Sequence, residues 1–243
     1  VWPSTRTDLY QRACEILCLE TNPEHTDFQG PSSSSTDIMT SAGYLCAVHL
    51  CGGTVGFALT AANADTHFPF IGELMGNREV LPISARRRIF QTEGPSRIAP
   101  IHRTVAEYLA GQFLVTRIRD GLPLQRVLAL ITGNDGGTLS DLRGLYAWIS
   151  CLLTEHAGTL IPRDPLGIIL YGDASALTLS TKQLALRSLA QLADKNPWFR
   201  SDDWSSKRPF GGLASPDMEP FFREVLGNPS VHPVFLHCVF DAM

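Results

Sequence analysis

A histidine and a glutamate with the spacing of a reactive pair, His102 and Glu107, lie in the segment PIHRTVAEYLAGQFL. Five helical steps of about 100° place them roughly 140° apart, so they cannot ligate one metal ion as the residues of HExxH do. His102 instead shares a face with Val105 and Leu109, which puts it at the start of an apolar stripe. Glu107 has the spacing of a helical ion pair with Arg103. From the residues alone, His102 is either a hydrogen-bonded histidine at a helix start or a ligand contact.

Three consecutive arginines, Arg86, Arg87 and Arg88, form the strongest local concentration of positive charge and are candidate phosphate contacts. A short run of this kind is usually a solvated face. The formal net charge of the chain is -4, so nucleic acid is not attracted to the molecule as a whole. A winged-helix nucleic-acid binder that uses these arginines and Arg97 remains an alternative interpretation.

Common motifs of phosphate-binding and hydrolytic enzymes are absent from the sequence. There is no GxxxxGK[ST] loop, no GxSxG elbow and no HExxH. The glycine-rich stretch 133–141 lacks the lysine of a phosphate loop, and we interpret it as a helix end, a turn and a helix cap at Ser140. The cysteines form no CxxC pair, so we predict no metal site and expect Cys14 and Cys18 to be reduced, buried thiols. We assign no catalytic residue and no cofactor to this chain.

The elements that position these residues are predicted to be mainly helices. The first helix is expected to end near Glu20, with Leu9 and Ile16 among the apolar residues at helical spacing. A polar linker that contains four consecutive serines follows, so residues 1–36 are interpreted as an N-terminal helix and linker. The next helix, from about Asp37, is stopped by the glycines at 52–53.

A small hairpin is predicted after these helices. Residues 54–60 have a β-like composition, and two short extended segments flank a turn at Gly94. The weak helix before them is expected to be interrupted at Pro82. Helices followed by a hairpin predict a winged-helix-like domain over residues 37–121.

Residues 122–243 read as a series of short helices with glycine or proline at nearly every junction. Asp164 is expected to cap one of them and Ser180 another. Short helices of this kind pack economically as stacked pairs, so we predict an irregular, HEAT-like α-solenoid array. No apolar run approaches the roughly 20 residues that cross a bilayer, so we expect a soluble, cytoplasmic protein without a membrane partner.

The segment PIHRTVAEYLAGQFL also resembles the hxHxxxxEahhAxxhh segment that follows the ATPase core of NACHT-type STAND NTPases. This family includes animal inflammasome receptors and bacterial anti-phage sensors. The later stretches GLPLQRVLALITGNDGGTLSDLRGLYAWISCLL and DPLGIILYGDASALTLSTKQLALRSLAQL resemble the family's helical region. The resemblance covers nearly the whole chain.

The resemblance implies a role in regulation. An NTPase core in cis, expected upstream of Val1, would bind ATP or ADP with Mg, and His102 would reach the β-phosphate. Glu107 matches the family's glutamate. The Walker motifs are missing here, so the resemblance implies that the chain is not an enzyme by itself.

The implied function is to couple nucleotide state to a sensor and an effector in bacterial anti-phage defence. The implied partners are the NTPase core, a C-terminal sensor region in cis and further copies of the protein in a homo-oligomer formed on activation. Nucleic acid is not an expected partner. A helical protein-interaction scaffold without a nucleotide role remains the other alternative.

Overall fold

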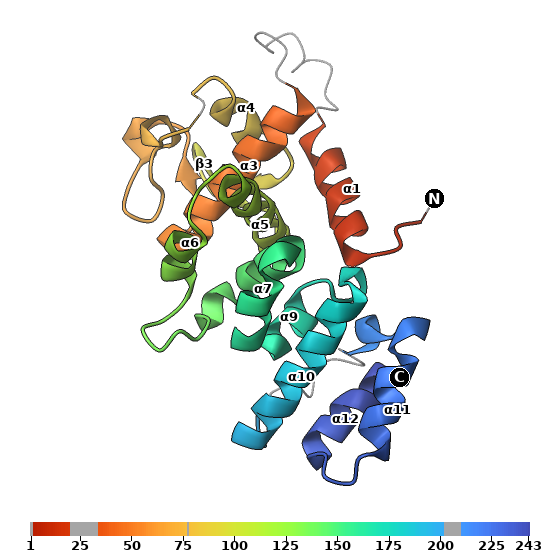
Figure 1. Cartoon of the computed structure of the whole chain (residues 1–243). Helices are drawn as coiled ribbons and strands as arrows, with labels where there is room; N and C mark the ends of the chain where they lie inside the picture. The colour runs from red at the N-terminus through yellow and green to blue at the C-terminus, as the bar shows by residue number, and fades with distance from the viewer. Residues whose placement is uncertain (1, 20–33, 77, 202–209) are drawn as a thin grey trace. The chain divides into compact units, whose positions relative to one another are not determined.

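The computed structural model describes residues 2–19, 34–76, 78–201 and 210–243, which are mainly helical, as predicted (Figure 1). The chain divides into two compact units. We call Asp8–Ile131 the hairpin unit, and Val1–Thr7 together with Thr132–Met243 the helical unit. No helix in the described parts of the chain has the length and apolarity needed to span a membrane.

Helices α3 and α5 form the centre of the hairpin unit. The helices of this unit are α1 (Arg6–Cys18, of which Arg6 and Thr7 belong to the helical unit), α3 (Ser35–Gly52), α4 (Leu81–Ala85), α5 (Arg103–Arg119) and α6 (Leu124–Ile131). The two central helices approach closely at Gly43, where a Cβ atom would lie 2.8 Å from the carbonyl oxygen of Leu109. The hairpin unit therefore includes α6 and most of α1 in addition to the elements predicted for the winged-helix-like domain.

Local sequence signals define both ends of α3. Ser34 Oγ accepts a hydrogen bond from the Asp37 N–H, and the Asp37 carboxylate accepts one from the Ser34 N–H, which makes a capping box. The helix ends at Gly53, whose φ of 63° is left-handed, so the predicted glycine stop is confirmed.

Three short strands form an antiparallel sheet in the order β1-β3-β2. They are β1 (Phe57–Ala58), β2 (Phe90–Thr92) and β3 (Arg97–Pro100), with Phe57 opposite Ile98 and Gln91 opposite Ala99. The predicted β2–β3 hairpin is confirmed, and Gly94 in its turn has a φ of 91°. The interruption expected at Pro82 is wrong, because this proline lies in the first turn of α4, where a missing N–H costs nothing.

The first predicted helix is confirmed as α1, but only part of its apolar spacing faces the core, because Ala13 and Leu17 are half-buried and the other two apolar positions are not. Leu9 and Ile16 are about half exposed or more, whereas Cys14 and Cys18 are buried. Tyr10 packs beside Tyr108 of α5, with ring centroids 5.5 Å apart. Contacts made by the thiols and this tyrosine determine which face of α1 is covered.

The helical unit is a succession of short helices. The α-helices are α7 (Arg143–Leu152), α8 (Ala157–Leu160), α9 (Pro165–Tyr171), α10 (Leu179–Lys195), α11 (Glu219–Gly227) and α12 (Pro233–Ala242). The 3-10 helix Ser140–Leu142 precedes α7, and between the α-helices lie the 3-10 helices Thr154–His156, Ile161–Arg163, Ala174–Ala176, Gly211–Leu213 and Pro216–Met218. Trp148 and Tyr146 of α7 are among its largest fully buried side chains.

The first two residues of α1, Arg6 and Thr7, belong to this unit and make polar contacts within it. The Arg6 guanidinium donates to the carbonyl oxygen of Gly172 at 2.6 Å. The Thr7 N–H donates to the carboxylate of Asp173 at 2.6 Å, and Asp173 is completely buried.

Helix caps in this unit agree only in part with the sequence prediction. Asp164 caps α9 as predicted, accepting a hydrogen bond from the Gly167 N–H at 2.9 Å. The caps predicted at Ser140 and Ser180 are wrong, because Ser140 lies inside a 3-10 helix and Thr178 caps α10. The mainly helical fold is thus confirmed, whereas the winged-helix and solenoid assignments stay predictions. Most of the predicted linker, residues 20–33, lies outside the described residues.

Candidate functional site at the N-terminus of α5

His102 is the N-cap residue of α5. Its backbone is extended, with φ −153° and ψ 136°, and its Nδ1 accepts a hydrogen bond from the Thr104 N–H at 3.2 Å. The preceding residue is held by a hydrogen bond from the Ile101 N–H to the carbonyl oxygen of Ile89. Strand β3 and this bond therefore determine where α5 begins and where the His102 ring is placed.

His102 Nδ1 makes two contacts with Thr104. It accepts a hydrogen bond from the Thr104 N–H at 3.2 Å and lies 2.8 Å from Thr104 Oγ1, where the tautomer decides which atom donates. In the tautomer in which Nδ1 accepts both hydrogen bonds, Nε2 carries the ring hydrogen. His102 is exposed, and the fully buried part of α5 starts at Ala106, so the ring does not begin the apolar face as the sequence analysis expected. An N–H donor at a helix N-terminus is a combination that favours an anion.

Glu107 is buried beneath this end of the helix. Its side chain is 9% exposed, and its Oε1 accepts a hydrogen bond from Arg103 Nε at 2.9 Å. Burial raises the pKa of Glu107, while its contact with Arg103 and the nearby His102 lower it. The ion pair predicted with Arg103 is confirmed, but the carboxylate belongs to the core of the unit and holds the arginine along α5.

A second histidine near this end of α5 was not recognised as part of the site from sequence. His49, in the last turn of α3, is half-buried, and the charge of Arg103 reaches it. His49 and Arg103 are far apart in the sequence, so residue spacing could not predict that they lie near each other. Only the packing of α3 on α5 brings these two residues together.

The three arginines do not form one basic face. Arg87 is buried, with 5% of its surface exposed, whereas Arg86 and Arg88 on either side are exposed. The positive charge of Arg87 lowers the pKa of the buried Cys18, although burial raises that pKa more, to about 11. The prediction that the arginine run is a solvated face is therefore wrong at Arg87. Because exposed and buried side chains alternate along the run, the structure does not support one phosphate site shared by the three arginines.

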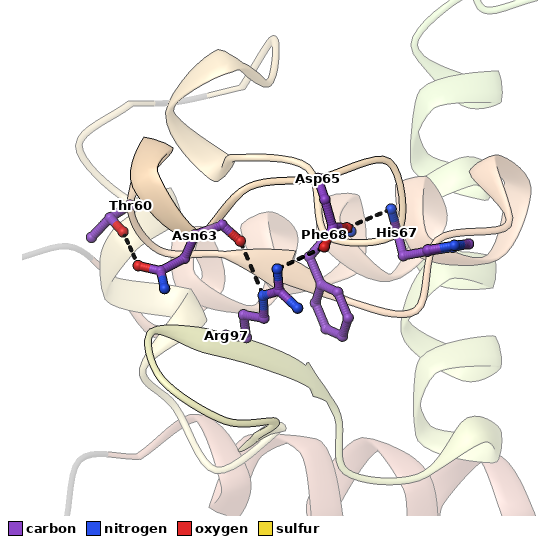
Figure 2. A network of polar contacts seen from close by, with 6 residues as sticks. All are labelled: Thr60, Asn63, Asp65, His67, Phe68 and Arg97. Carbon is purple, nitrogen blue, oxygen red and sulfur yellow. Dashed lines mark hydrogen bonds and ion pairs between the residues drawn. The ribbon is translucent and has the colours of Figure 1, made fainter.

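Arg97 is engaged by a loop of its own unit (Figure 2). Its Nε donates to the carbonyl oxygen of Asn63 at 3.0 Å, and its Nη2 pairs with the Asp65 carboxylate at 2.6 Å. The guanidinium lies 4.6 Å from the ring centroid of Phe68, a cation–π contact. Asp65 also accepts hydrogen bonds from the His67 and Phe68 N–H groups, which lower its pKa. These contacts weaken the nucleic-acid alternative, because they compete with a phosphate for Arg97.

Replacing Arg97 with lysine is expected to release the loop at residues 63–68. A lysine cannot reproduce both hydrogen bonds and the stacking of a planar guanidinium. Hydrogen exchange of the His67 and Phe68 amides should become several-fold faster, while exchange across α5 stays unchanged. The matched control is Arg117→Lys, which alters an exposed pair with Asp120 in the same unit. Equal exchange in parent and R97K would contradict this role.

The predicted burial of the N-terminal thiols is confirmed. Cys14 and Cys18 are buried, and burial raises the pKa of Cys14 to about 12. In the described residues, no group of three or more His, Cys, Asp or Glu side chains is arranged to hold a metal ion. Because their pKa values are raised, the Cys14 and Cys18 thiols are protonated near neutral pH and contribute to packing in the core.

No family model, no curated protein and no solved structure matches this chain. The chemistry of the α5 site therefore follows from its own residues. The residue whose position is best defined there is His102, through its capping hydrogen bond and its exposed ring.

Proposed function

We propose that this chain is the regulatory region of a STAND-type, NACHT-like NTPase, and that His102 contacts the β-phosphate of ADP bound to an NTPase core in cis. The observation that carries the proposal is the geometry of His102: Nδ1 caps α5, and the ring is exposed at the N-terminus of the helix. In the tautomer in which Nδ1 only accepts, Nε2–H is free to donate to an anion. The resemblance of the surrounding sequence supplies the identity of the anion.

The order of elements supports a winged-helix-like domain around this histidine. Helix α3, strand β1, helix α4 and the β2–β3 hairpin follow one another, and α5 begins directly after β3. Because the sheet order is β1-β3-β2, the central strand β3 leads to His102. A displacement of the ring on ligand contact would therefore be transmitted to the sheet through β3 and to α3 through α5.

The proposed mechanism is a shift between two states of the longer protein. In the ADP-bound state, the ring and the N-terminus of α5 contact the phosphate. Such a contact biases the equilibrium only if it is absent or weaker in the other state. The helical region would carry this bias to a C-terminal sensor region, and activation would end in a homo-oligomer that serves anti-phage defence.

We assign the hydrolysis of ATP to the core and not to this chain. Phosphoryl transfer requires a phosphate cradle and an acid that holds Mg, and the sequence contains no Walker motif. Purified chain without a core is therefore expected to leave ATP unchanged. Hydrolysis that disappears in His102→Ala would contradict this assignment.

The proposal is tested by ADP release from the chain expressed together with the proposed NTPase core. In His102→Asn the side chain still caps the helix, since asparagine is a favoured N-cap, but the ring N–H is lost. One charge-assisted hydrogen bond contributes about 1.5 kcal/mol, so ADP should dissociate about tenfold faster. The rate is measured by displacement of a fluorescent ADP analogue.

His232 provides the matched control. It caps α12 in the same way, accepting a hydrogen bond from the Val234 N–H at 3.2 Å. His232→Asn should leave ADP release unchanged. Unchanged release in H102N, or a preceding sequence without a P-loop, would reject the nucleotide role and leave the scaffold interpretation.

A further inference from the structure

His49 holds the end of α3 in an environment suited to a neutral ring. Its carbonyl oxygen accepts hydrogen bonds from the Gly53 and Thr54 N–H groups, so its backbone anchors the turn from α3 toward β1. The ring is half-buried, and its Nδ1 is fully buried without a hydrogen-bond partner among the described residues. A positive charge on this partly buried ring is costly, because burial disfavours it and Nδ1 makes no well-formed hydrogen bond.

The charges around His49 add to this cost. Arg103 of α5 is the cation that acts on the ring, and Glu107 is engaged with Arg103 through its Oε1. On α3 itself, Cys51 is a half-buried thiol whose pKa is raised by burial. From the loop, His67 is bonded through its backbone to the Val55 N–H and has an exposed side chain. Of these groups, Arg103 opposes a second positive charge directly.

We propose that His49 is an acid-sensitive group whose protonation loosens the packing between the end of α3 and the start of α5. The neutral ring fits the buried position, whereas the imidazolium adds a partly buried positive charge that the charge of Arg103 opposes. Mild acid would therefore destabilise the hairpin unit at this end. The inference goes beyond the proposed function and does not depend on nucleotide binding.

The direction of the pH effect follows from the pKa of His49. Burial lowers it below the ordinary histidine value of about 6.5, and Arg103 lowers it further, while the Thr54 backbone opposes them. The unfolded chain thus binds the proton more tightly, so stability falls as the pH drops below about 6.5 and is constant above it. Glu107 works in the opposite direction, because its raised pKa adds stability toward more acidic pH.

The test combines two measurements on the chain as it stands. Urea unfolding of the hairpin unit, followed by hydrogen exchange of α3 and α5, is compared at pH 7.5 and 5.5 for the parent and His49→Gln. The unfolding constant of the parent should rise several-fold more than that of H49Q, with an upper limit of about tenfold at one unit below the ordinary pKa. His67→Gln, which removes an exposed histidine of the same unit, should behave as the parent.

A titration of the His49 ring by NMR in the parent provides the second measurement and does not require the variant to fold. A ring pKa below that of His67 supports the inference. A ring that titrates at or above about 6.5 would overturn it. An H49Q variant with the full pH dependence of the parent, or an H67Q variant that loses it, would also overturn it.

Discussion

Asp164→Ala is expected to destabilise the helical unit by about 3 kcal/mol, because it removes two interactions at once. The carboxylate receives hydrogen bonds from Arg143 Nε and Nη2, both at 2.8 Å, and its side chain is only 12% exposed. It also caps α9 through the Gly167 N–H. Without it, the Arg143 charge remains partly buried above the ring of Tyr171. Urea unfolding monitored by hydrogen exchange of α7 and α9 measures the loss.

An exposed ion pair of the same unit serves as the control for Asp164. Glu219 accepts hydrogen bonds from Arg223 one turn later, but the two side chains are 63% and 78% exposed. Solvent screening leaves such a pair with at most about 1 kcal/mol. If D164A and Glu219→Ala destabilise the unit equally, burial and capping do not explain the role of Asp164.

Gly56→Ala is expected to cost the hairpin unit about 3 kcal/mol, because the space at this position is filled by backbone. A Cβ atom on Gly56 would overlap the carbonyl oxygen of Ile98 in β3 and approach the Phe68 ring to 3.0 Å. Residue 56 precedes β1 directly and donates its N–H to the carbonyl oxygen of His67. An added methyl group must therefore separate β1 from β3 or displace the loop. Loss of hydrogen-exchange protection in β3 measures this effect.

Gly52→Ala is the control for the Gly56 substitution. It lies four residues earlier, at the end of α3, and an added Cβ would meet only Thr54 Cγ2 at an ordinary 3.7 Å. Alanine is also the better helix former. Stability of G52A should therefore stay within about 1 kcal/mol of the parent. A Gly56→Ala variant as stable as G52A would show that β1 and β3 separate at little cost.

Local signals gave correct predictions wherever one short segment decides the structure. The stop of α3 at Gly53, the turn at Gly94 and the cap of α9 at Asp164 depend on residues within a few positions of each other. A competing local signal caused the error at Ser180. Thr178 lies two residues before Ser180 and caps α10 in its place. Serine and threonine are both favoured N-cap residues, so the sequence does not distinguish the two positions.

Contacts between distant segments were beyond the reach of sequence spacing. The pairing of Arg97 with Asp65 joins residues 32 positions apart, and periodicity carries no information about it. The burial of Arg87 within a run of exposed arginines depends on how the turn after α4 packs. For the same reason, the charge pattern suggested a basic surface, whereas in the structure Arg87 is buried and Arg97 is paired with Asp65.

The candidate site was predicted in part. His102 was correctly placed at a helix start, because Val105 and Leu109 follow it at helical spacing and no proline interrupts the segment. The ring's exposure and the burial of Glu107 were not anticipated, since the helical face that is covered depends on α3. The helical repeat gives the angles between residues around one helix, but the packing of the neighbouring helix determines which residues face the core.

The contact between His102 and a phosphate is tested most directly by NMR of the imidazole nitrogens. The chain, joined to the proposed NTPase core, is labelled with 15N-histidine and titrated with ADP, and with AMP as the ligand that lacks the β-phosphate. ADP is expected to shift the Nε2 signal of His102 and to leave that of His232 unchanged, while AMP shifts neither. A His102 Nε2 signal that stays the same at saturating ADP would contradict the proposed nucleotide contact.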